Sequence, residues 1–205
     1  MSMLKLRLLR QSLSVLTFVV LSMLAMQVSH ADIIHFVANL DGPSEFPPNL
    51  SPGTGFVQID YDDVAHTLDI SATFSGLTGT TSNAHIHCCV DPSAVTPTAG
   101  VATTTPSFVL FPLGVTSGTH DELLDLTLAS SFNAAFITAN GGTPATAETA
   151  LIAGMLAGHA YYNIHTSAFS GGEIRGFLTE VPEPATLALL GLGLAGIGFA
   201  RRPKR

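Results

Sequence analysis

The chain has 205 residues, of which 46% are hydrophobic and 11% charged, and its formal net charge is −7 at pH 7. Its basic residues gather at the two ends, so residues 32–180 contain fourteen acidic side chains and one basic side chain, Arg175, and carry a net charge of −13. Nucleic-acid binding needs clustered Lys and Arg, and this composition excludes it. The same charge favours cations and keeps an extracellular domain soluble.

The first 31 residues predict a secretory signal peptide. Three basic residues open the segment and residues 12–26 are apolar. Ser29 and Ala31 place small side chains at the −3 and −1 positions of a signal peptidase site, so the mature protein would begin at Asp32. The alternative is an N-terminal anchor that is not cleaved.

Residues 32–180 predict one domain, long enough to bury a core without disulfide support. Alternating apolar and polar side chains predict strands at 33–40, 55–61, 66–74, around residue 85, and at 122–128, 159–166 and 173–179. Residues 131–139 and 144–157 predict short helices, and residues 88–120 predict a long loop. Short strands with Gly/Pro turns and little helix indicate an antiparallel β-sandwich.

Histidines recur in two of these predicted strands. His85 and His87 are two residues apart and so share a strand face, and His165 lies near the end of the 159–166 strand. If Ile86 and Ile164 pack into the core, the three imidazoles face outward, beneath the 88–120 loop. Neutral imidazole binds copper or zinc, which makes a three-histidine metal site one interpretation. The alternative is that these histidines only hydrogen bond to loop backbone.

Cys88 and Cys89 are the only two cysteines, so no disulfide framework exists. Three interpretations stay open: a vicinal disulfide, favoured by an oxidising compartment; a soft copper ligand beside the histidines; or two small loop residues that form no bond.

Glu173 and Arg175 are also two residues apart and share a strand face. A structural salt bridge or a backbone clamp is the first interpretation of Arg175. The alternative is that Arg175 steers an anion toward a metal. No nucleophile motif, P-loop or dinucleotide fingerprint accompanies these residues.

The C-terminal segment 181–205 has three parts: the sequence Pro182-Glu183-Pro184, an apolar run over 185–200, and a basic end. As a helix the apolar run would be about 24 Å long, slightly short of a hydrocarbon core of ~30 Å. We expect a transmembrane helix whose basic tail stays cytoplasmic. The pattern resembles the PEP-CTERM sorting signal of Gram-negative bacteria. The resemblance implies that an exosortase recognises Pro182, Glu183 and Pro184 and that the tail is removed at the cell surface. A plain tail anchor is the alternative.

A second resemblance covers almost all of residues 34–179. Its matching stretches are 36–42, 45–48 and 53–55, then Ala84-His85-Ile86-His87, and finally Tyr162-Asn163-Ile164-His165-Thr166 with Gly172-Glu173-Ile174-Arg175-Gly176. Together they are similar to the CHRD domain. This family implies an immunoglobulin-like β-sandwich in an extracellular setting, and it implies no established catalytic activity.

A weaker likeness is to copper–zinc superoxide dismutase, in which a Gly-Leu-Thr turn leads into a His-x-His strand, as Gly76-Leu77-Thr78 leads to His85 here. This likeness implies that His85, His87 and His165 are copper ligands and that Arg175 steers anions. The chain departs from that family because it shows no bridging histidine and no zinc subsite, so dismutation would lack its second metal.

Two hypotheses of function follow from these observations. The first is an exported, non-catalytic module in the envelope or exopolysaccharide matrix of a Gram-negative bacterium, processed by signal peptidase and exosortase and held in the membrane through 185–200 before processing. The second is a copper-binding protein with a redox or metal-carrier role that acts through His85, His87 and His165.

Overall fold

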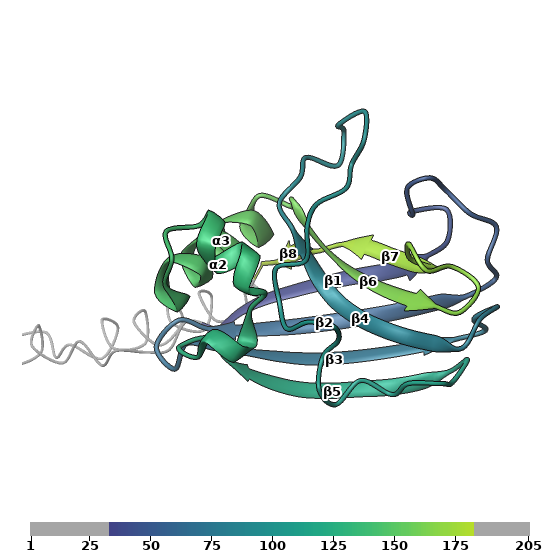
Figure 1. The fold of residues 1–205 in the computed structure, drawn as a ribbon, viewed down its shortest axis with the longest axis horizontal. Coiled ribbons are helices and arrows are strands. Elements are labelled where there is room, and N and C mark those ends of the chain that lie inside the picture. Colours follow the sequence, from purple (N-terminus) through teal and green to yellow (C-terminus); the bar gives the residue numbers. More distant parts are fainter. Residues whose placement is uncertain (1–32, 183–205) are drawn as a thin grey trace, which may run out of the picture. The chain divides into compact units, whose positions relative to one another are not determined.

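The computed structural model describes residues 33–182, which form an eight-stranded antiparallel sheet with helices packed at one end (Figure 1). The strands are β1 (Ile33–Asp41), β2 (Thr54–Asp62), β3 (Thr67–Ser75), β4 (Thr81–Cys88), β5 (Gly118–Asp125), β6 (Ala160–Thr166), β7 (Ile174–Phe177) and β8 (Thr179–Val181). They lie in the order β4-β6-β7-β1-β2-β3-β5, and β8 pairs with β1. The predicted antiparallel β fold is confirmed.

The sheet curls, so its two ends face each other across a shared core, as the layers of a sandwich do (Figure 1). His120 on β5 shows this closure, because its Nδ1 atom lies 3.0 Å from the hydroxyl of Tyr162 on β6. On β1, β2 and β3 burial alternates residue by residue, since one face packs inward and the other meets solvent. The buried side chains include Phe36, Leu40, Val57, Ile59, Leu68, Ile70, Ile86, Leu126, Ile164 and Ile174.

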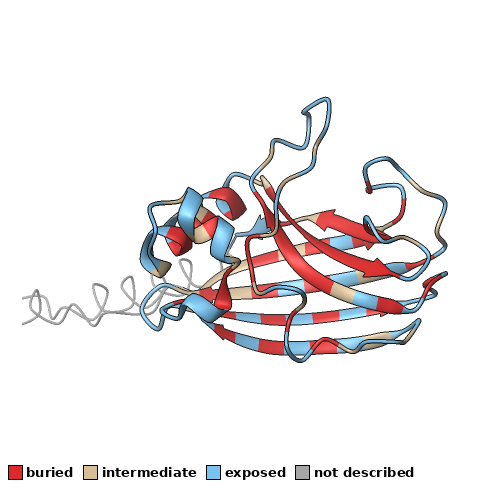
Figure 2. Ribbon diagram, in the orientation of Figure 1, coloured by how far each residue is buried: buried red, intermediate tan, exposed pale blue. Residues whose placement is uncertain are grey.

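Strands β4 and β6 depart from this alternation. Every residue of β6 and the last five residues of β4 are buried, which appears in Figure 2 as nearly continuous red. One face of these strands packs into the core through Ile86 and Ile164. The other face carries polar side chains, and its burial shows that loops cover it.

Helices α2 (Ala134–Ala139) and α3 (Pro144–Leu156) follow a short 3₁₀ turn at Ala129–Ser131. Thr143 begins α3 as a capping box with Thr146, and Pro144 occupies the first turn, where its missing N–H costs nothing. Gly158, with a φ of 69°, follows the end of α3 and leads the chain into β6. Both predicted helical segments therefore contain helix, α2 being shorter than expected.

Two strand predictions were wrong in their bounds. The strand expected at 122–128 is β5, which begins at Gly118 and ends at Asp125, because Asp125 turns the chain by accepting a hydrogen bond from the Thr127 N–H. The single strand expected at 173–179 is two strands. Leu178 donates its N–H to Ala160, and beyond it the chain changes partner from β6 to β1.

The predicted signal peptide at 1–31 and the predicted transmembrane helix at 185–200 lie outside the described residues. Within residues 33–182, none of the helices has the length and hydropathy needed to cross a membrane.

Candidate metal centre

The outer face of β4, β6 and β7 brings together the polar residues that the sequence singles out. The strand register places His85 opposite Asn163, and Asn163 opposite Arg175. In the adjacent row, His87 lies opposite Tyr161. Because side chains two residues apart point the same way, His165 joins this face beyond Asn163.

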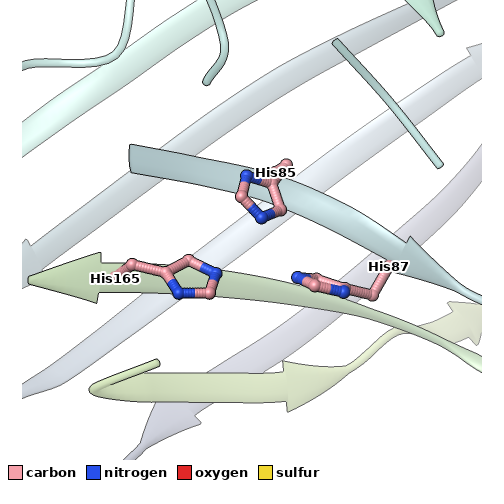
Figure 3. Close-up of side chains that lie close together, drawn as sticks. All are labelled: His85, His87 and His165. Atoms are coloured by element: carbon pink, nitrogen blue, oxygen red, sulfur yellow. The ribbon is translucent and has the colours of Figure 1, made fainter. Parts of the chain in front are cut away.

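The three histidines converge on one point from two strands. Figure 3 shows the rings of His85 and His87 from β4 and of His165 from β6 turned toward one another. One nitrogen from each ring lies within 4.8 Å of the other two. The ring centroids are 4.7 Å apart for His85–His87, 4.7 Å for His85–His165 and 5.8 Å for His87–His165. Each residue is at most 9% exposed.

Loop carbonyls fix how the rings of His87 and His165 are oriented. The Nδ1 atom of His87 lies 2.8 Å from the Ala99 carbonyl oxygen, and the Nδ1 atom of His165 lies 2.9 Å from the Ser170 carbonyl oxygen. A carbonyl can only accept, so the ring nitrogen that it contacts carries the proton.

One ring nitrogen of each histidine has no hydrogen-bond partner in the part of the chain that the structure describes. His85 Nδ1, His87 Nε2 and His165 Nε2 are buried and have no hydrogen-bond partner among residues 33–182. A buried polar atom without a partner costs about 1–3 kcal/mol, so three together call for an explanation. Histidines that ligate metals typically donate their other N–H to a carbonyl or carboxylate in the same way.

The site keeps its imidazoles neutral. Burial, together with the neighbouring rings of His87 and His165, lowers the pKa of His85 to about 3. Burial also lowers the pKa of His87 to about 4 and holds the pKa of His165 below its usual range. Neutral imidazole is the form that binds a metal, so these residues do not need to lose protons near neutral pH.

The geometry fits one transition-metal ion. Metal–nitrogen bonds of about 2.0–2.1 Å place ligand nitrogens roughly 3.5 Å apart, so the three side chains need only a small inward movement from their present separations. The ligand set contains imidazole alone, which suits copper, zinc, iron or nickel. Among the described residues, this is the one cluster of histidine, cysteine or carboxylate side chains close enough to hold a metal.

Arg175 lies beside this cluster and is almost fully buried. Its Nε atom donates to the carbonyl of Ser44 and its Nη1 atom to the carbonyl of Pro97 at 3.0 Å. The guanidinium also lies over the ring of Tyr161, 4.7 Å from its centroid. Arg175 therefore clamps two covering loops to the sheet. An anion-steering role stays a prediction, and two of the donor atoms of Arg175 already serve the backbone.

Glu173 is not the ionic partner of Arg175, which instead has Glu45 3.7 Å away. Burial opposes ionisation of Glu173, but hydrogen bonds from Ser51, Thr166 and the backbone outweigh it and hold its pKa below the usual range. The carboxylate of Glu173 thus joins the loops at 51 and 78–79 to Thr166 at the end of β6. This is a structural role that the sequence did not indicate.

Cys88 and Cys89 are bonded to each other in the structure. Cys88 belongs to the hydrophobic core and Cys89 is exposed, and neither joins the cluster of three histidines. The two residues line a cavity of about 470 Å³ together with residues of α2 and the 100–101 segment. That this vicinal disulfide forms in the exported protein stays a prediction.

The other histidines with described contacts lie elsewhere. His35 contacts Asp60, His66 contacts Glu148, and His120 lies between Tyr162 and Glu122 in the core. Three neighbours of the metal centre were not predicted as site residues: Tyr161, Asn163 and Glu45. Tyr161 and Asn163 lie four and two residues before His165 on one strand, so alternation is a signal that could have found them. Glu45 lies in a loop and has no such signal.

Two family sequence models match the chain. The sequence model of the CHRD domain matches residues 36–178, and the model of the PEP-CTERM protein-sorting motif matches residues 180–205. No curated protein and no solved structure matches the chain.

Proposed function

Because the chain belongs to the CHRD domain family and ends in a PEP-CTERM sorting motif, we propose that this exported protein binds one copper ion through His85, His87 and His165. PEP-CTERM signals mark proteins that Gram-negative bacteria export to the cell surface with the help of an exosortase. The copper site is the part of this proposal that the geometry of the three histidines supports.

One observation carries the proposal. His85 Nδ1, His87 Nε2 and His165 Nε2 are buried, have no partner among the described residues, and belong to rings that face one another. Backbone carbonyls occupy the opposite nitrogens of His87 and His165, so the free lone pairs are fixed in position. A structural role in hydrogen bonding to loops would explain the bonded nitrogens but not the unpartnered ones.

Copper is favoured over the other metals that imidazole accepts. The site has no carboxylate or carbonyl ligand, which magnesium, calcium and manganese would need. Among the first-row divalent ions, copper binds most tightly to a given nitrogen site. The strongly acidic domain surface would also concentrate cations near the site.

The covered geometry supports a binding role over a catalytic one. In a catalytic metal site, substrate must be able to reach an open coordination position. The three ligands here are only 4–9% exposed. We therefore propose that the protein is a non-catalytic copper-binding module of the cell surface or of the surrounding exopolysaccharide matrix.

Anaerobic copper loading followed by metal analysis tests this proposal. We expect one copper ion per wild-type protein and none retained after dialysis in the His85→Ala/His87→Ala double variant. His159→Ala is the matched control, because His159 lies outside the cluster and should leave copper uptake unchanged. Equal copper retention by the wild type and the double variant would refute the site.

A further inference from the structure

A copper ion needs a way through the loops that cover the metal centre. The described residues offer a cavity of about 350 Å³ between the segments 45–49 and 168–172. Ser170, one of its lining residues, accepts the hydrogen bond from His165 that orients this ligand. The wall of the cavity is therefore in direct contact with the metal centre.

Two buried acceptor atoms without a hydrogen-bond partner in the described chain lie next to Gly172, a lining residue of this cavity. Oε1 of Glu45 and Oδ1 of Asn163 are buried and have no hydrogen-bond partner among residues 33–182. The two residues are only 5% and 2% exposed. Both atoms lie beneath Gly172, where an added Cβ would be 2.6 Å from Glu45 Oε1 and 2.7 Å from Asn163 Oδ1. The two oxygens thus lie on the same side of Gly172, with the amide nitrogen of Asn163 at a similar distance of 2.8 Å from the added Cβ.

Asn163 connects this point with the histidines. It lies directly opposite His85 in the strand register and two residues from His165 on the same strand face. Opposed side chains in antiparallel strands have Cβ atoms about 5 Å apart. A cation held by the oxygens of Glu45 and Asn163 would therefore be one short step from the ligand nitrogens.

The charge of Glu45 decides whether a cation can pass. Arg175 lies 3.7 Å from Oε2 of Glu45, and its positive charge would repel an approaching copper ion if it were left alone. The carboxylate of Glu45 offsets that charge and leaves Oε1 free to face the cavity. A neutral side chain at this position would leave the passage with a net positive charge.

We infer that the cavity between 45–49 and 168–172 is the loading route of the metal centre and that Glu45 and Asn163 form a transient oxygen site for the incoming copper ion. This inference rests on the proposed copper binding and adds the path by which the ion arrives. The site would change the rate of loading and not the number of ions held at equilibrium.

Stopped-flow mixing with Cu²⁺ tests the role of Glu45. Tyr161 reports binding, because its ring is stacked 4.8 Å from that of His87 and the protein contains no tryptophan to mask tyrosine fluorescence. We expect Glu45→Gln to load about tenfold more slowly than wild type at pH 8 and to reach the same one ion per protein. Asp69→Asn is the matched control: it removes an equal charge from the exposed face of β3 and should change the rate less than twofold.

A second pair of variants tests the path itself, independently of charge. Gly171 lines this cavity and Gly100 lines the cavity beside Cys88, and both have open space where a side chain would begin. Gly171→Phe should obstruct the proposed route and slow loading about tenfold. Gly100→Phe adds the same bulk at the other cavity and should load at the wild-type rate.

The outcomes separate this inference from the proposed function. Slow loading of Glu45→Gln and Gly171→Phe with full final occupancy supports the route. Normal rates in both variants, or slow loading only in Gly100→Phe, would overturn the route while leaving copper binding intact. A wild-type protein that takes up no copper would overturn the proposed function and this inference with it.

Discussion

The Nδ1 atom of His87 lies 2.8 Å from the carbonyl oxygen of Ala99, and this contact turns the unpartnered Nε2 atom of His87 toward His165. Ala99 belongs to the long segment between β4 and β5, so a loop determines which nitrogen of a strand residue is free. The hydroxyl of Tyr161 is held by the same loop residue, since it accepts a hydrogen bond from the Ala99 N–H at 3.2 Å. Loop and strand are therefore joined at the ligand.

Acid should destabilise the metal-free protein through its buried histidines. Their pKa values are lowered in the folded state, to about 3 for His85 and about 4 for His87, against about 6.5 in the unfolded chain. Below pH 6.5 the unfolded state binds more protons than the folded state. The free energy of unfolding therefore decreases as the pH is lowered, by up to about 1.4 kcal/mol per pH unit for each histidine.

Urea denaturation between pH 7.5 and 5 measures this effect. Other groups also titrate, among them Glu45, whose pKa burial raises to about 7 and which acts in the opposite direction. His85→Leu isolates one histidine, and its slope should be shallower than that of wild type by an amount that approaches about 1.4 kcal/mol per pH unit near pH 5. If the free energy of unfolding changed with pH at the same rate in wild type and in His85→Leu, His85 would not be held neutral by the fold.

Removing the Arg175 clamp should cost stability. Arg175→Met leaves Glu45 buried without its charge partner and frees the carbonyls of Ser44 and Pro97. Breaking a buried ion pair typically costs about 3–5 kcal/mol. Urea denaturation should show a loss of this size, and the double variant Arg175→Met/Glu45→Gln should recover part of it. No recovery in the double variant would mean that the cost comes from the backbone contacts alone.

A side chain at position 154 should conflict with the bonded cysteines. A Cβ atom added to Gly154 on α3 would collide with the sulfur atoms of both Cys88 and Cys89. Gly154→Ala should therefore lower the free energy of unfolding by about 1–3 kcal/mol. In a Cys88→Ala/Cys89→Ala background the same substitution should be nearly neutral, because the obstructing atoms are gone. Equal costs in both backgrounds would contradict this packing.

The sorting hypothesis predicts where the C-terminus of the mature protein lies. In cells that contain an exosortase, the surface form should lack residues 185–205, whereas a variant with Pro182→Ala and Glu183→Ala should retain them. Intact mass spectrometry of the surface fraction distinguishes the two products. Retention of the complete tail by the wild-type protein would favour a plain tail anchor over removal.

The sequence predicted those parts of the fold that depend on local pattern. Leu68, Ile70, Ala72 and Phe74 alternate with polar residues, and β3 buries these four side chains. The bounds of β5 were missed because His120 and Glu122 are polar yet buried, paired with each other and with Tyr162. A pattern that equates polar with exposed cannot detect such a pair.

The convergence of the three histidines was predicted in the same way. Alternation on two strands placed His85, His87 and His165 on an outward face beneath the 88–120 loop, and the structure brings the three together there. Glu45 could not be found in this way, because it reaches the site through long-range packing. Its only described ionic contact is with Arg175, which lies 130 positions later in the chain.

A crystal structure of the copper-loaded protein, with anomalous diffraction recorded at the copper edge, tests the central claim most directly. We expect one strong peak about 2 Å from His85 Nδ1, His87 Nε2 and His165 Nε2, with the carbonyls of Ala99 and Ser170 still bonded to the opposite nitrogens. A copper peak at any other place in the domain, or no peak after loading, would contradict the assignment of these three histidines as the metal centre.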